Sequence, residues 1–171
     1  MTAPSIITRP ATATERRLVQ ASWTRQAIRG KRFEVPTFGG SRQAMFRVNR
    51  RVYMSEDALY RAHRLLVDDV LSRDGVSVVV GAISSVPEAA LGWACAELGL
   101  IHFIFVKGEC RRNGVGTALL SAAVKLAGPS WHASHLTSEG GNALLKSWES
   151  QHGQPRAVVP QSQDQAAQTD L

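Results

Sequence analysis

The sequence predicts an α/β chain with an antiparallel sheet in its first half and a βαβ unit near its end. A run rich in β-branched residues at 75–83 and an apolar run at 89–97 flank the turn "SSVPE", which favours an antiparallel hairpin. A helix rich in small residues is expected at 115–127, between strands at 100–106 and 130–136. The order strand, helix, strand is that of a βαβ unit.

The first part of the chain is expected to hold a strand, a helix and an irregular basic segment. Residues 5–9 form a short strand that a proline ends, and residues 14–28 carry a crude apolar stripe at helical spacing. Residues 30–45 contain Pro36 and two adjacent glycines, which interrupt regular structure. We therefore expect a loop there and no regular element.

The clearest helix lies at residues 55–73, "SEDALYRAHRLLVDDVLSR". Ser55 can cap it, and the two acidic residues that follow suit the positive end of the helix dipole. Its apolar residues recur at helical spacing: Leu59, Ala62, Leu66 and Val70.

The second half continues in alternating elements. The segment "LIHFIFV" at 100–106 is apolar at six of seven positions, which predicts a strand buried on both faces. A helix is expected at 141–152 and a last short strand at 155–159. The polar residues 160–171 lack periodicity and are predicted to be a disordered tail, which leaves a single domain over 1–159.

Length and composition indicate a globular protein without metals or disulfides. The 171 residues are 44% hydrophobic and 20% charged, enough for a core of normal size. Cys95 and Cys110 form no CxxC motif, which favours two reduced thiols. The N-terminus lacks the apolar region of a signal peptide, and no apolar run approaches the ~18 residues of a membrane span. These observations predict a cytoplasmic protein.

The net charge of +6 is unevenly distributed. Residues 1–51 carry eleven basic and two acidic side chains, +9, whereas the rest of the chain carries nine and twelve, −3. Such asymmetry fits a solvated basic face, and it equally fits an anionic cofactor or substrate.

The stretch "VKGECRRNGVGTALL" places two arginines and two glycines where a buried strand becomes a helix. A helix N-terminus presents unpaired N–H groups and partial positive charge, and glycines let an anion approach the backbone. Arg111 and Arg112 add bidentate donors. The spacing fits neither GxxxxGK[ST] nor GxGxxG, since Leu119 stands where the latter needs a glycine. The segment is therefore predicted to bind phosphates.

The pattern R-x-x-G-x-G, here Arg111, Gly114 and Gly116, resembles the acetyl-CoA-binding motif of the GNAT superfamily of N-acetyltransferases. The order of elements from Ser5 to about Val159 is also similar to that family. The resemblance implies a GNAT-like α+β fold, a mixed, mostly antiparallel, twisted sheet of about six strands with helices on both faces. It suits a bacterial or phage protein.

The resemblance also implies which residues bind acetyl-CoA, the co-substrate. The strand end at Ile104, Phe105 and Val106 would hydrogen-bond the pantetheine arm, where strands 100–106 and 130–136 splay apart. Asn142 resembles an asparagine that contacts the arm from the next helix. The pyrophosphate would lie on the backbone N–H groups of Arg111, Arg112, Asn113, Gly114, Val115, Gly116 and Thr117.

Acetyl transfer to an amine needs a general base, because a lysine-like amine is neutral only about once in 2,500 at pH 7. His102 is the first candidate, expected on the same strand face as Leu100 and Ile104. A core histidine with one hydrogen bond is the alternative. Glu97 is the second candidate, and as a strand-end residue it could equally be solvated.

The family often places a tyrosine on the helix after the fifth strand as general acid, and this sequence lacks it. Its tyrosines, Tyr53 and Tyr60, lie far upstream, and Trp148 stands roughly in the tyrosine's place. Substitutes are Ser134, His135 or Ser147, or no acid is needed. A nucleophilic Cys110 and a metal held by the histidines both have weak support, so no metal site is expected.

The resemblance therefore implies an N-acetyltransferase that acts by direct attack of a primary amine in a ternary complex. The basic residues 9–51 favour an acidic or nucleic-acid-borne acceptor over a polyamine. Phe33, Phe38 and Phe46 could stack on bases there or form core. The alternatives are an inactive GNAT fold that binds CoA or a polyanion, and a plain nucleic-acid-binding protein. Relatives often dimerise, so a homodimer is an expectation.

Overall fold

The computed structural model describes residues 5–28, 32–36, 42–47, 53–134, 139–152 and 157–158. In chain order the elements are β1 (Ile6–Pro10), α1 (Ala13–Ile28), β2 (Arg32–Pro36), β3 (Arg42–Arg47), β4 (Tyr53–Ser55), α2 (Glu56–Ser72), β5 (Ser77–Ile83), β6 (Gly92–Glu97), β7 (Leu100–Val106), the 3-10 turn Gly108–Cys110, α3 (Val115–Ala127), β8 (His132–Ala133), α4 (Glu139–His152) and β9 (Ala157–Val158).

The chain divides into two compact units, one of residues 1–10 with 75–171 and one of residues 11–74. The first unit holds a six-stranded sheet in the order β1-β5-β6-β7-β8-β9. The pairs from β1 to β7 are antiparallel, and β8 and β9 continue the sheet in parallel. This confirms the predicted mixed, mostly antiparallel sheet, the hairpin and the βαβ unit β7-α3-β8.

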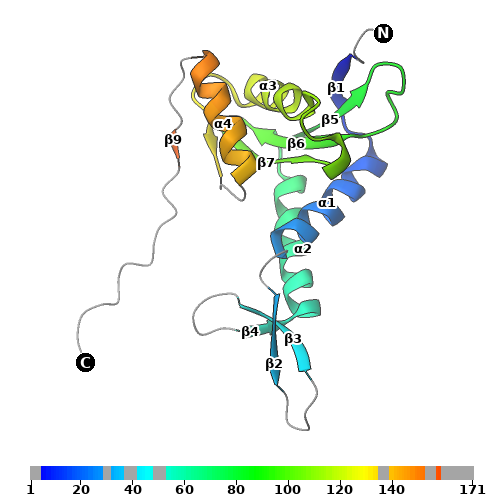
Figure 1. The fold of residues 1–171 in the computed structure, drawn as a ribbon, viewed down its shortest axis with the longest axis vertical. Coiled ribbons are helices and arrows are strands. Elements are labelled where there is room, and N and C mark those ends of the chain that lie inside the picture. The colour runs from blue at the N-terminus through cyan, green and yellow to red at the C-terminus, as the bar shows by residue number, and fades with distance from the viewer. Residues whose placement is uncertain are drawn as a thin grey trace, which may run out of the picture. The chain divides into compact units, whose positions relative to one another are not determined.

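In the first unit, α3 covers one face of the sheet (Figure 1). Leu119 of α3 is fully buried, and it lies against Gly81 of β5 and Gly92 of β6, which pair across the two strands. The two glycines leave no side chains between the helix and the strands, so the helix can approach the sheet closely. Leu145 and Trp148 of α4 join the same buried cluster.

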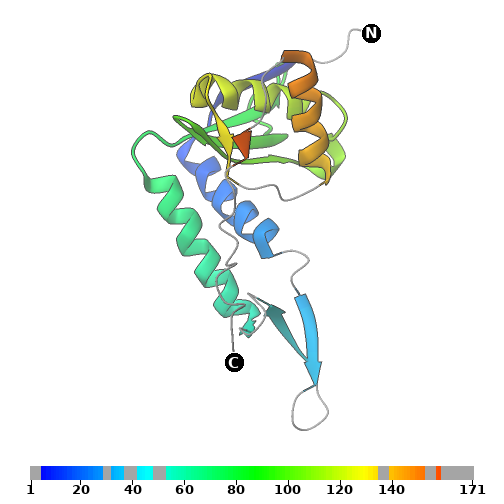
Figure 2. The ribbon, with the colours of Figure 1, turned by 90° about the vertical axis from the view of Figure 1, so that its left-hand side faces the viewer.

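In the second unit, α1 and α2 run side by side in opposite directions, as Figure 2 shows. Near one end, the Arg16 guanidinium donates to the backbone oxygen of Leu71 at 3.2 Å. Near the other, Ile28 packs on Leu59. The predicted cap of α2 is confirmed, because Ser55 Oγ accepts from a backbone N–H in the first turn at 3.3 Å.

The start of α1 is also capped. The Thr12 hydroxyl accepts from the Glu15 N–H at 3.2 Å, and the Glu15 carboxylate accepts from the Thr12 N–H at 2.8 Å. This reciprocal arrangement satisfies two N–H groups that a helix end leaves unpaired.

The expectation of no regular element over residues 30–45 is wrong for the described part of that range. The segments β2 and β3 pair antiparallel, and β4 completes a three-stranded sheet. Pro36 is the last residue of β2, which is an edge strand, and proline is tolerated there because its missing N–H faces no partner. Residues 37–41, with both glycines, lie outside the described residues.

Three further expectations meet the structure only in part. In β7, Ile101 and His102 are buried, but residues 103–106 are half-buried, so this strand is not covered on both faces throughout. The strand expected at 130–136 is described only as His132–Ala133, and 135–136 lie outside the described residues. The tail 160–171 also lies outside them, so the predicted boundary at 159 stays a prediction.

Among the described helices, none combines the length and apolarity that a membrane span needs.

Candidate active site

The strand β7 contains one residue more than its partner β6. Cys95 lies opposite Phe103 and Ala96 lies opposite Ile101, so His102 has no partner in the ladder. This extra residue is a β-bulge, and it shifts the side-chain alternation by one position. The shift explains why Ile101 and Ile104, three residues apart, both pack against the core cluster beneath α3.

The bulge overturns one half of the expectation about His102: the histidine shares a face with Leu100, which lies opposite Glu97, but not with Ile104. By the alternation of β6, Glu97 lies on the face of Trp93 and Cys95, opposite the cluster that contains Ile104. His102 Nε2 lies 2.8 Å from Glu97 Oε1, so the histidine belongs to the Glu97 face. A bulge cannot be recognised from apolar periodicity, which is why the face was mispredicted.

The two candidate bases therefore form one hydrogen-bonded pair. The His102 side chain is 6% exposed and that of Glu97 is 23% exposed, so the pair is mostly removed from water. A carboxylate only accepts hydrogen bonds, so in this contact His102 Nε2 is the donor. The hydrogen bond orients the imidazole ring beside the carboxylate.

Directly beyond the bulge, β7 and β8 separate. The parallel pairing covers only Leu100 with His132 and Ile101 with Ala133. Two further bonds close this region, from Ser134 N–H to Ile101 O at 3.0 Å and from Ser134 Oγ to His102 O at 2.9 Å. Among the described residues, no strand pairs with Phe103–Val106 along that edge. Backbone groups of Ile104 and Phe105 along this edge have no strand partner there, whereas the Val106 carbonyl accepts from Arg111 Nε at 3.5 Å. The role predicted for Ile104, Phe105 and Val106 stays a prediction.

The turn between β7 and α3 is basic and exposed. Its exposed charged side chains are Lys107, Glu109, Arg111 and Arg112, which leave a net +2. Arg112 has φ +63° and Gly114 has φ +80°, both in the left-handed region. Left-handed residues within a turn point successive N–H groups toward one side, and such concave backbone binds anions.

The same turn leads into the N-terminus of α3. Gly114 caps the helix without a side chain, and its carbonyl accepts from the Ala118 N–H at 3.0 Å. A Cβ added at Gly114 would meet no heavy atom within 4 Å, so the space before the helix is open. Within the described chain, no backbone acceptor outside the helix takes up the N–H groups of residues 112–117. These residues fit the pyrophosphate of acetyl-CoA.

The other residues predicted to bind acetyl-CoA lie outside the hydrogen-bonded pair of His102 and Glu97. Asn142 lies half-buried in the first turn of α4 and, among the described residues, makes no hydrogen bond to the turn before α3. The two glycines of the R-x-x-G-x-G motif have different surroundings. Gly116 lies against Leu144 of α4 and Val106 of β7, whereas Gly114 faces open space.

The candidate general acids are placed differently. The Ser134 hydroxyl donates to the His102 carbonyl, so it lies at the separation of β7 and β8. Ser147 is exposed on α4, where its hydroxyl accepts from Gln151. Trp148 is buried and stacks on the His152 ring at 3.7 Å. His135 lies outside the described residues, and no group of acidic, histidine or cysteine side chains in the described part could hold a metal.

Sequence reasoning missed a second group of residues, in the unit of residues 11–74. They line a cavity between α1 and α2, and all but the alanine are polar: Arg17, Gln20, Ala21, Thr24, Tyr60 and Arg64. The spacing on each helix was visible in the sequence, but the pairing of the two helix faces was not.

The sequence matches the model of the acetyltransferase (GNAT) family over residues 33–143. No curated protein is significantly similar to it in sequence. A solved acetyl transferase from Pyrococcus furiosus aligns with a TM-score of 0.53 and 16% identity, covering 91% of this chain and 97% of that one. The histone acetyltransferase HPA2 and related acetyltransferase from Corynebacterium glutamicum aligns at 0.55 and 16%, covering 86% and 84%.

At such identities the solved structures establish the fold, and the family match establishes the relationship. The match spans well over half of the chain and includes both the bulge in β7 and the turn before α3. The chain therefore belongs to the acetyltransferase (GNAT) family and is an N-acetyltransferase that uses acetyl-CoA as its acetyl donor.

Proposed function

We propose that this protein acetylates a primary amine by direct attack in a ternary complex, with His102 and Glu97 acting together as the general base. The observation that carries the proposal is the 2.8 Å hydrogen bond between His102 Nε2 and Glu97 Oε1. It lies at the bulge of β7, directly after Ile101, the last residue of that strand that pairs with β8.

The turn and the strand edge hold the donor. The N–H groups of residues 112–117 bind the pyrophosphate, and the guanidinium groups of Arg111 and Arg112 neutralise its charge. The N–H of Arg111, which the sequence also assigned to this role, instead donates to the Gly108 carbonyl at 3.4 Å. The open edge at Ile104–Val106 pairs with the pantetheine amides as a neighbouring strand would. Asn142 contacts the same arm from α4. When bound in this way, acetyl-CoA supplies a thioester carbonyl beside the separation of β7 and β8.

The base pair makes the amine nucleophilic. At neutral pH an alkyl amine is almost entirely protonated, so its proton has to leave before or during attack. His102 accepts that proton directly or through one water, and the Glu97 carboxylate holds the imidazole ring in place through their hydrogen bond. The amine nitrogen then bonds to the carbonyl carbon, and the carbon–sulfur bond breaks with its electron pair going to sulfur. The second proton of the attacking amine passes to this sulfur, so the products are the neutral amide and the thiol of CoA.

The acceptor proposed here is acidic or carried by a nucleic acid. The support is charge, since the thirteen basic and seven acidic side chains of residues 11–74 leave +6, equal to the net charge of the whole chain. A cationic acceptor such as a polyamine is repelled by this field.

The test is an acetylation assay with [¹⁴C]acetyl-CoA and three acceptor classes: spermidine, acidic peptides with a free amine, and amine-bearing oligonucleotides. We expect acetylation of an acidic class with higher kcat/KM than spermidine, and a loss of at least about 100-fold in kcat for His102→Ala. Preference for spermidine would refute the acceptor class. Unchanged kcat in both His102→Ala and Glu97→Ala would refute the base assignment.

A further inference from the structure

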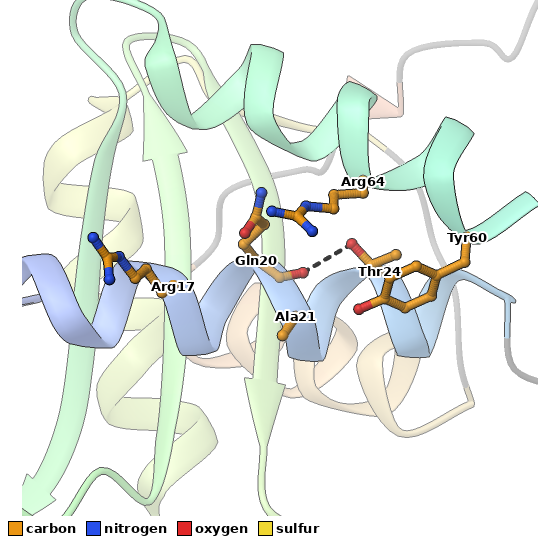
Figure 3. Close-up of a pocket in the computed structure, with 6 residues that line it drawn as sticks. All are labelled: Arg17, Gln20, Ala21, Thr24, Tyr60 and Arg64. Atoms are coloured by element: carbon orange, nitrogen blue, oxygen red, sulfur yellow. Dashed lines mark hydrogen bonds between the residues drawn. The ribbon is translucent and has the colours of Figure 1, made fainter. Parts of the chain in front are cut away.

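The cavity between α1 and α2 lies wholly within the unit of residues 11–74 and encloses about 400 Å³. Figure 3 shows that α1 supplies Arg17, Gln20, Ala21 and Thr24, and α2 supplies Tyr60 and Arg64. The α1 residues are spaced i, i+3, i+4 and i+7, and the α2 residues i and i+4. Each set therefore lies on one helix face, and the two faces oppose each other.

Small side chains open the cavity. Ala21 and the fully buried Thr24 occupy the middle of the α1 face, where longer side chains would fill the space between the helices. The Thr24 hydroxyl donates to the Gln20 backbone oxygen at 2.9 Å, so it is held against its own helix. The Tyr60 ring extends from α2 toward α1 and forms one wall (Figure 3).

The charge lining the cavity is positive. Among the residues that the structure describes, Arg17 makes no ion pair and no hydrogen bond through its side chain. Arg64 has a loose contact with Asp68, at 3.9 Å, and that carboxylate also accepts from the Gln20 side-chain amide. Asp68 is not among the residues that line the cavity, whereas Arg17 and Arg64 line it from two different helices.

We propose that this cavity binds the phosphate monoester of a small organic molecule, with Arg17 and Arg64 on the phosphate. A monoester carries nearly two negative charges at neutral pH and matches two guanidinium groups, whereas a carboxylate or a phosphodiester carries one. The volume exceeds that of a bare phosphate and suits an added ring of nucleoside size, for which Tyr60 is a stacking surface. The site does not depend on the proposed acetyl transfer.

The test measures binding of uridine 5′-monophosphate to the full chain by calorimetry, with uridine, succinate and a 5′-hydroxyl oligonucleotide as comparisons. We expect the monophosphate to bind more tightly than each of these. Arg17→Ala and Arg64→Ala should each weaken it about tenfold to a hundredfold, the usual loss of a charge-assisted contact. Both arginines are exposed, so thermal melts should show that the variants fold.

Two controls separate this site from others. Arg61→Ala removes an exposed arginine of α2 that does not line the cavity, and Arg111→Ala removes a charge from the turn before α3; both should leave the affinity within twofold. Ala21→Leu keeps both arginines but fills the cavity floor, and it should abolish binding without lowering helix propensity.

Equal binding of uridine or succinate would overturn the proposal, as would an oligonucleotide that binds more tightly and depends on the same two arginines. Loss of binding in Arg111→Ala but not in Arg17→Ala would place the phosphate at the turn before α3 and would also overturn it. Acetyl-transfer activity is not a readout in any arm, so failure here leaves the proposed function untouched.

Discussion

His102 and Glu97 touch each other, and this contact decides how their substitution should behave. If the two groups act as one unit, removing either removes the unit, and removing both adds little. We expect His102→Ala and Glu97→Ala each to lower kcat by about 10² to 10⁴, and the double variant to match the slower single variant within about threefold. The KM for acetyl-CoA should not change.

Steady-state kinetics on the four proteins measures this coupling. Glu97→Gln keeps the size of the side chain and loses the carboxylate, so it should resemble Glu97→Ala in kcat. Effects that multiply in the double variant would show two independent roles instead of one pair.

Gly114 allows a substitution test in which charge alone varies. Asn and Asp both tolerate the left-handed backbone found there, at φ +80°. Gly114→Asp should weaken acetyl-CoA binding at least about tenfold more than Gly114→Asn, because a carboxylate repels the pyrophosphate. The same carboxylate favours the helix N-terminus, so the melting temperature without ligand should not fall. Calorimetry gives the affinity, and equal affinities of the two variants would contradict a phosphate at this position.

At the scale of elements, the close approach of β6 to β7 at Gly92 depends on the absence of a side chain there. A Cβ at Gly92 would lie 2.4 Å from the Phe105 carbonyl oxygen and 3.0 Å from Leu119 Cδ1. The backbone oxygen cannot move without moving β7, so we expect Gly92→Ala to lower the free energy of unfolding by about 2–3 kcal/mol. Urea unfolding measures this. Gly108→Ala is the matched control, because a Cβ there meets nothing within 4 Å and should cost little.

Elements bounded by strong local signals were predicted well from the sequence. The helix α3 has the predicted limits, Val115–Ala127, because glycines stand at both of its ends and fix where the backbone leaves the helix. The segment β2 was missed because Pro36 suggested a break, although a proline at the end of an edge strand disturbs no ladder.

The sequence predicted which residues belong to the candidate active site better than it predicted how they are arranged in space. Arg111, Gly114 and Gly116 follow a local motif, so the sequence alone located the turn before α3. The face of His102 depends on one extra residue in the ladder, and the cavity that contains Arg17 and Arg64 depends on two helices meeting. Both are tertiary features, and no local pattern records them.

At the scale of the whole molecule, the charge is divided between the two units. Residues 11–74 carry +6, and residues 1–10 with 75–171 carry seven basic and seven acidic side chains, which sum to zero. Affinity for polyanions should therefore reside in the unit of residues 11–74 and should depend steeply on salt. For a single-stranded oligonucleotide with three phosphates in contact with the protein, we expect binding to weaken about twentyfold between 50 and 200 mM salt. Fluorescence anisotropy measures this, and an affinity insensitive to salt would contradict it.

The bulge in β7 has a consequence for how the fold and the chemistry are related. Without His102 the strand would become "LIFIFV", and its alternation would be unbroken, with Ile101, Ile104 and Val106 still on the core side. The histidine is thus a supernumerary residue that the sheet does not need. Because we propose His102 as part of the base, we expect a chain with His102 deleted to fold, to bind acetyl-CoA and to lose at least as much kcat as His102→Ala, so that one residue inserted in a strand would supply the chemistry that the scaffold lacks.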